Sequence, residues 1–281
     1  MVRDQKNEYE LQHIPSLVAN FEVIRKRPHT FVNLDDLHSI LSNKSYREHF
    51  FHEAETAWQY IFDPDKIAVC LSRRDEKSYR YLKQVRKFGN VLRSSYRAYS
   101  INHHCPDLLH DFLVKLGEYN DYYPLPLGAP IAEKILQARP MWESLNKGDT
   151  TLQYAETSSF QNYMAKMIKD ILILLEKRSL SMAAFHSLRK KVRTFMNLAQ
   201  IPAVEHVDRA EHQFFYMLYE LSTKIGDVHR NFVKKDIRGK IDYANSLVTI
   251  DPDWQRYFLE HLSYIKKACG INSASFSEYE N

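Results

Sequence analysis

Apolar residues recur three and four positions apart along most of the chain, which is the spacing of one face of an α-helix. The clearest stretch, residues 159–178, keeps this spacing from Phe160 to Leu175. The helix over residues 159–178 ends at residues 179–181. Residues 65–72 fit either a helical turn or a short strand. The same pattern predicts further helices over residues 45–62, 76–100, 106–119, 130–146, 182–200, 208–225 and 229–247, and a last helix after Asp251.

Two of the predicted helices share one layout of basic and apolar positions. Beside its apolar stripe each carries a row of four side chains: Lys83, Arg86, Lys87 and Asn90 in the first helix, and His186, Arg189, Lys190 and Arg193 in the second. A similar phrase follows each helix, Leu-Gly-Glu at residues 116–118 and Ile-Gly-Asp at residues 225–227, although the chain has only 7 glycines. We expect both phrases to form turns. A repeat of this kind constrains the whole architecture.

We therefore predict an all-α fold of two tandem helical bundles, related by internal duplication with pseudo-two-fold symmetry. The polar stretch at residues 146–151 is the boundary that we expect between the bundles. The predicted organisation is an N-terminal arm or first partial helix over residues 1–37, a first bundle over 38–150, a second bundle over 151–269 and a disordered tail over 270–281.

Composition narrows the class of protein. The 281 residues are 44% hydrophobic, which suffices for one large core or two ordinary ones, and 7 glycines and 10 prolines favour helices. The 3 cysteines do not make a disulfide framework and indicate reduced thiols. Residues 1–10 lack the apolar run of a signal peptide, and the longest apolar run, residues 171–175, is far below the ~20 residues of a membrane helix. We expect a cytoplasmic protein with no membrane association.

The net charge of +4 is too small to indicate a polyanionic ligand by itself, so a basic surface must come from local arrangement. Each helical residue advances about 100° around the axis, which places the row from His186 to Arg193 on one arc beside the apolar face. Cations spaced in this way repel by a few tenths of a kcal/mol per pair. An anion or facing carboxylates would relieve the repulsion. The two rows are either solvated surface or the two walls of one groove.

The phrase Phe-His-Ser-Leu-Arg-Lys-Lys-Val-Arg at residues 185–193 resembles the signature helix of the CHAD family, the conserved histidine α-helical domain. That helix has a histidine, an arginine three positions later and a basic residue four positions after that. The two Gly-acidic phrases also look like segments of that family. The resemblance covers about residues 38–268. It implies a duplicated helical bundle that binds inorganic polyphosphate in a basic channel between its halves.

Arg93 and Arg97 continue the first row along its helix. The resemblance assigns ligand binding to His186, Arg189, Lys190 and Arg193 in the second half, and to Arg86, Lys87 and Arg93 in the first. Lys83 joins this set because it stands where the second half has His186. A planar guanidinium can hold two phosphate oxygens, and a histidine with the usual pKa near 6.5 would bind more tightly in mildly acidic solution. We predict a non-catalytic polyphosphate-binding protein with no cofactor and no metal ligands.

Two other functions fit parts of the sequence. The same basic rows could form a helical scaffold that binds an acidic protein partner. The pair His110 and Asp111, with Asp121 or Asp170 as a further ligand, resembles the metal site of an all-helical phosphohydrolase of the HD type. The 18 tyrosines and 15 phenylalanines follow apolar helix faces and belong to the core, so we do not expect nucleic acid as a ligand.

Overall fold

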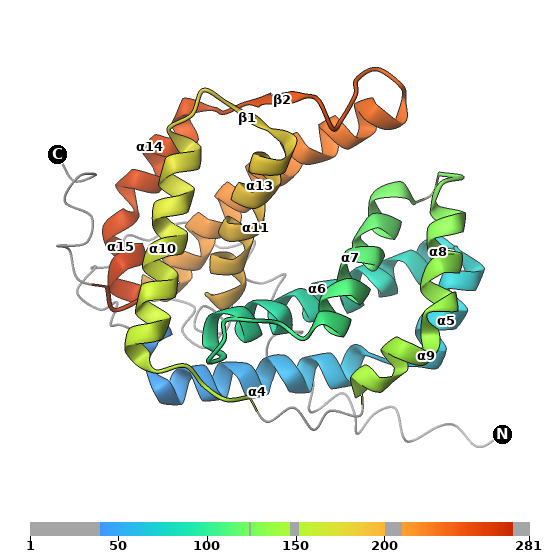
Figure 1. The fold of residues 1–281 in the computed structure, drawn as a ribbon, viewed down its shortest axis with the longest axis horizontal. Coiled ribbons are helices and arrows are strands. Elements are labelled where there is room, and N and C mark those ends of the chain that lie inside the picture. The colour runs from blue at the N-terminus through green and yellow to red at the C-terminus, as the bar shows by residue number, and fades with distance from the viewer. Residues whose placement is uncertain (1–39, 124, 147–151, 200–209, 272–281) are drawn as a thin grey trace.

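The computed structural model describes residues 40–123, 125–146, 152–199 and 210–271. These residues are mostly helical, which confirms the predicted helical class (Figure 1). A short antiparallel pair joins β1 (Ser179–Ser181) to β2 (Leu247–Thr249). Numbered as in Figure 1, the helices are η3 (Ile40–Ser42), α4 (Lys44–Ile61), α5 (Pro64–Arg73), α6 (Glu76–Tyr99), α7 (Asp107–Tyr122), α8 (Gly128–Gln137), α9 (Arg139–Trp142), η4 (Glu143–Asn146), α10 (Thr157–Leu175), α11 (Met182–Leu198), α13 (Ala210–Ile237), α14 (Pro252–Glu260) and α15 (Leu262–Ala268).

Two groups of helices meet along α6 and α11. In Figure 1, α5, α7, α8 and α9 lie on one side, α10, α11, α13, α14 and α15 lie on the other, and α4 runs along one edge beneath both groups. Helix α6 packs against α4, α7 and α11, while α11 packs against α10 and α13. The two helices with basic rows are therefore in direct contact.

Both basic helices begin at a capped residue. The carboxylate of Asp75 accepts a hydrogen bond from the backbone N–H of Ser78 at 2.7 Å, and the Ser181 hydroxyl accepts one from Ala184 at 3.3 Å. Such caps satisfy N–H groups that have no partner inside the helix and contribute about 1 kcal/mol each. Asp63 caps α5 in the same way, with Pro64 at its start, so residues 65–72 are helix and not strand.

Buried apolar faces behind the basic rows hold the two groups together. Leu82, Val85 and Leu92 of α6 and Phe185, Leu188 and Val192 of α11 belong to one core that continues through both groups. Burying a side chain of this size contributes about 1.5–3 kcal/mol. At the crossing of the two helices, Asn197 Nδ2 donates hydrogen bonds to the Ser94 hydroxyl at 2.9 Å and to the Asn90 carbonyl at 3.2 Å. These buried polar contacts fix the register between α6 and α11.

Several predicted boundaries are wrong. The helices expected over residues 208–225 and 229–247 form one helix, α13, followed by a loop and β2. Both Gly-acidic phrases lie inside helices, Gly117 in α7 and Gly226 in α13, and not in turns. A glycine inside a helix costs only about 1 kcal/mol, which tertiary packing overcomes. By contrast, the kink or break that Pro140 predicts within residues 130–146 is confirmed, because the helix divides after α8 and Pro140 lies in the first turn of α9, where no N–H is needed.

Parts of the predicted organisation lie outside the described residues. These are the N-terminal arm over 1–37, most of the boundary stretch at 146–151 and the tail from residue 272 onward. At the start of the expected tail, Gly270 adopts a φ of +66° and donates its N–H to the Lys267 carbonyl, which closes α15. The two groups differ in their helices and in the strand pair, and the internal duplication stays a prediction.

The three cysteines of the chain lie among the described residues. Cys70, Cys105 and Cys269 are all free and buried. The Cys105 thiol has its pKa raised to about 12, mainly by burial, so it is not poised as a nucleophile. No helix in the described part of the chain combines the length and the apolar character needed to cross a lipid bilayer.

The glycines of α6 and α13 allow a matched test of this packing. A β-carbon on Gly89 would lie 2.4 Å from Leu113 Cδ2 and 2.7 Å from Trp58 Cζ3, whereas one on Gly226 would meet no described atom within 4 Å. Gly89→Ala should therefore lower the free energy of unfolding by about 1–3 kcal/mol through overpacking. Gly226→Ala should raise it by about 0.4–1 kcal/mol through reduced backbone entropy of the unfolded chain. Urea denaturation of both variants measures this, and equal effects would contradict the packing described for α6.

Candidate anion-binding site

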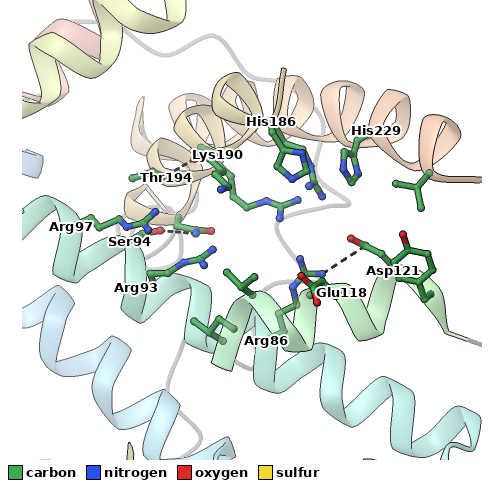
Figure 2. A pocket seen from close by; sticks show the side chains of 18 of the residues that line it. Arg86, Arg93, Ser94, Arg97, Glu118, Asp121, His186, Lys190, Thr194 and His229 are labelled. Atoms are coloured by element: carbon green, nitrogen blue, oxygen red, sulfur yellow. Dashed lines mark hydrogen bonds and ion pairs between the residues drawn. The ribbon is translucent and has the colours of Figure 1, made fainter. Parts of the chain in front are cut away.

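A pocket lies between the helix pair α6–α7 and the helix pair α11–α13 (Figure 2). Its volume is about 290 Å3. Side chains from all four helices and from the loop after α13 line it. Six of these are basic: Arg86, Arg93, Arg97, Arg189, Lys190 and Arg193. The arginines of the two rows thus face one shared space, as the groove hypothesis requires.

Six of the eight candidate residues from the sequence line this pocket: His186, Arg189, Lys190, Arg193, Arg86 and Arg93. Lys83 and Lys87 lie outside it. The Lys83 Nζ atom lies 5.6 Å from the centre of the Tyr79 ring, and that of Lys87 lies 5.6 Å from the Phe88 ring. The reason is helical geometry, because Arg86, Arg93 and Arg97 fall within a narrow arc of α6 while Lys87 is rotated about 100° from Arg86. Arg97 continues the row and was not among the eight.

Burial and mutual repulsion lower the pKa values of the pocket cations. The pKa of Arg193 falls to about 9, through burial first and then through Arg189 and Arg86. The pKa of Arg189 falls to about 10 through burial and through Arg86, and that of Arg93 falls to about 10 through burial and Arg97. Burial and the nearby arginines also lower the pKa of Lys190. The protein therefore holds several positive charges together with less solvation than they have in water.

The carboxylates beside the pocket compensate little of this charge. Two acidic residues line it, Glu118 and Asp121. Asp121 Oδ1 is 4.0 Å from Arg86 Nη1, which is an ion pair at the limit of contact, and Glu118 is exposed. The buried Nε atoms of Arg86 and Arg189 have no hydrogen-bond partner among the described residues. Buried donors and charges without partners are costly, so an anion in the pocket would be stabilised by groups already in place.

Gly117 makes room for one of these guanidinium groups. A β-carbon at this position would lie 2.6 Å from Arg86 Nη2 and 2.9 Å from Arg86 Cζ. Only glycine therefore allows the Arg86 side chain to lie across α7 in this way. Gly226, its counterpart in the sequence repeat, has no such neighbour, so the likeness of the two phrases does not extend to this role.

One end of the pocket carries a cluster of two histidines and a tyrosine. The Tyr243 hydroxyl lies 3.2 Å from His186 Nδ1 and 2.9 Å from His229 Nε2. Burial and the nearby Arg189 lower the pKa of His186 to about 4 and that of His229 to about 3. Both rings are therefore neutral near pH 7. This corrects the expectation that His186 titrates in mildly acidic solution, since its pKa in the free protein lies well below 6.5.

Sequence reasoning did not identify His229, Tyr243 or Asp121 as parts of the site. His229 follows the second Gly-acidic phrase by two residues and is not part of a basic row. Tyr243 lies beyond α13, and its N–H donates to the Asp236 carboxylate at 3.0 Å. Nothing in local spacing places that loop over the pocket, because its position depends on the full length of α13 and on the pairing of β1 with β2.

The residues of the metal-dependent alternative do not come together. His110 Nδ1 lies 3.1 Å from Arg97 Nη2, and Asp170 accepts a hydrogen bond from Lys191 at 2.7 Å. Asp111 is exposed, and Asp121 pairs with Arg86. Within the described ranges no group of three His, Cys, Asp or Glu side chains has an arrangement that could hold a metal ion. A metal site needs such convergence of ligands.

Comparison with family models, with curated proteins and with solved structures gives no match for this chain. The assignment of a function therefore depends on the geometry and charge of the pocket.

The neutral histidines make stability sensitive to acid. In the unfolded chain they take up protons near pH 6.5, but in the folded protein only near pH 4 and 3, so the free energy of unfolding falls as pH drops from about 6.5 towards 4. Buried His229 alone contributes a slope of up to about 1.4 kcal/mol per pH unit in this range. Urea denaturation at pH 7 and pH 5 should show this loss. His229→Gln should reduce it, and the matched change at the exposed His52 should not; equal slopes in all three proteins would contradict the described environment of His229.

Proposed function

We propose that the protein binds inorganic polyphosphate in the pocket between α6–α7 and α11–α13, without catalysis. The observation that carries this proposal is the set of five arginines and one lysine in a single pocket whose acidic lining residues are Glu118 and Asp121. Cations held together against their own repulsion, with donors left unpaired, favour a ligand of high negative charge density.

A phosphate chain fits the chemistry of these donors. It presents a regular series of negatively charged oxygens, and an arginine can bind two of them at once through its planar fork. The unpaired Nε atoms of Arg86 and Arg189 would gain acceptors. Binding would release counterions from the chain, so the affinity should depend strongly on salt. A single small anion would satisfy fewer of the six cations.

The proposal also includes the internal duplication, the family type and the location of the protein. In it, the pairs α6–α7 and α11–α13 are equivalent elements of two duplicated bundles, and the chain is a divergent CHAD-type protein. The cytoplasm is the proposed location, where thiols such as those of the three free cysteines stay reduced. The contact of α6 with α11 and the shared pocket support the proposal, since each basic row supplies one wall.

A charge-reversal experiment tests the assignment. Arg189→Glu combined with Arg193→Glu should weaken binding of long-chain polyphosphate by at least ~100-fold, because each charge-assisted hydrogen bond contributes about 1.5–3 kcal/mol. Lys83→Glu combined with Lys87→Glu is the matched control, with the same change in net charge on residues outside the pocket. It should lower the affinity by only a few fold through long-range electrostatics. Fluorescence anisotropy with labelled polyphosphate measures both.

The outcome separates the alternatives. Equal losses in the two double variants would show that the ligand binds to general surface charge and not in the pocket. A scaffold for an acidic protein would leave free polyphosphate unbound by the wild-type chain. Circular dichroism of the pocket variant checks its fold; the relief of repulsion among Arg86, Arg189 and Arg193 gives no reason for it to unfold.

Gly117 offers a test that changes no charge. Gly117→Ala should displace the Arg86 guanidinium, because the added β-carbon would lie 2.6 Å from Arg86 Nη2. We expect polyphosphate affinity to fall by about ten-fold, which is about 1.4 kcal/mol. Gly226→Ala, the matched change in the other phrase, should leave the affinity unaltered. Wild-type affinity in Gly117→Ala would mean that the placement of Arg86 does not matter for the ligand.

A further inference from the structure

The two ends of the pocket differ in charge. Figure 2 shows Arg93, Arg97 and Lys190 toward one end and Asp121 and His229 at the other. Arg86, Arg189 and Arg193 lie close to one another and to Asp121, since, besides burial, Arg86 lowers the pKa of Arg189, Arg86 and Arg189 lower that of Arg193, and Asp121 raises all three. A chain of identical phosphates that ran through the whole pocket would bind cations at one end and face the Asp121 carboxylate at the other.

The far end, formed by Asp121, His186, His229 and Tyr243, offers groups that interact with a hydrogen-bond donor. The Asp121 carboxylate can only accept hydrogen bonds, and each neutral imidazole has one accepting nitrogen. The Tyr243 hydroxyl has a single proton and lies within reach of both histidines, so it can donate to only one of them. The Nδ1 atom of His229 is buried with no partner among the described residues, although His229 lines the pocket.

The end of a phosphate chain matches the acceptors of this cluster better than an interior phosphate does. An interior phosphate is fully ionised near neutral pH and has oxygens that accept hydrogen bonds, so it would face Asp121 acceptor to acceptor. A terminal phosphate has a second ionisation near pH 6, as a phosphate monoester does. It therefore supplies a P–OH donor for part of the time, and more negative charge than an interior phosphate for the rest.

We propose that the pocket binds the terminus of a phosphate chain, which enters past Arg97 and Lys190 and ends against Asp121 and the His186–Tyr243–His229 cluster. The terminal oxygens lie among Arg86, Arg189 and Arg193, and the terminal P–OH donates to the Asp121 carboxylate or to an imidazole nitrogen. The inference rests on the proposed function and specifies which part of the ligand is recognised. The ligand is a linear phosphate chain whose ends are free.

Capped chains test the inference directly. Linear polyphosphate of one length is prepared with both ends free and with both ends blocked as methyl esters, which removes the terminal P–OH and leaves the interior unchanged. Isothermal titration calorimetry with the wild-type protein should show at least ten-fold weaker binding of the blocked chain. With free ends, no more than two protein molecules should bind per chain, whatever its length.

A charge-matched pair of variants checks the role of the far end. Asp121→Asn removes the negative charge and replaces one accepting oxygen by an NH2 group that can donate to a blocked chain, so it should narrow the difference in affinity between free and blocked chains. Asp111→Asn makes the same charge change on α7 at an exposed residue outside the pocket lining, and it should preserve the wild-type difference.

The outcomes distinguish recognition of the chain terminus from polyphosphate binding in general. Equal binding of free and blocked chains, with a stoichiometry that grows with length, would overturn the inference and leave the proposed function in place. Absence of binding to either chain would overturn both. An unchanged ratio of free to blocked affinity in Asp121→Asn would count against this end of the pocket as the recognition point for the terminus.

Discussion

Repulsion among buried cations is the physical constraint on which the site depends. Besides burial, Arg86 lowers the pKa of Arg189, and both of them lower the pKa of Arg193, so nothing in the interaction of these arginines favours the contact of α6 with α11. The apolar faces behind them and the buried hydrogen bonds of Asn197 to Ser94 and Asn90 hold the two helices together. The fold thus stores an unfavourable charge arrangement at the place where a ligand can relieve it.

This arrangement links stability and binding in opposite directions. Charges that are desolvated and unpaired reduce the stability of the free protein, and the same charges raise the affinity for an anion because they are already oriented. Burial, and after it the positive charge of Arg189, depresses the pKa values of His186 and His229. An anion that neutralises the arginines would also raise the pKa values of these histidines, so ligand charge and histidine protonation are coupled.

Part of this site was accessible from the sequence and part was not. Helical spacing placed Arg86, Arg93 and the row from His186 to Arg193 on faces beside the core, and six of the eight candidates line the pocket. Lys83 and Lys87 do not, because they lie about 60° and 100° around α6 from Arg86, outside the narrow arc of Arg86, Arg93 and Arg97. The contribution of Tyr243 depends on a loop fixed by long-range contacts. Gly117 was singled out as part of a repeat, whereas its role is to admit a guanidinium. Periodicity predicted the helical class, but the turn expected at Gly226 placed a helix boundary inside α13.

Binding of a polyanion through several simultaneous ion contacts should depend steeply on salt. Isothermal titration calorimetry of the wild-type protein with long-chain polyphosphate at 50 mM and 200 mM salt measures this dependence. We expect measurable binding at the lower salt concentration and a linear fall of log affinity with log salt concentration, with a slope of roughly four to six, close to the number of pocket cations engaged. Absence of binding at 50 mM salt, or an affinity that does not change with salt, would show that the pocket does not bind the chain in this way.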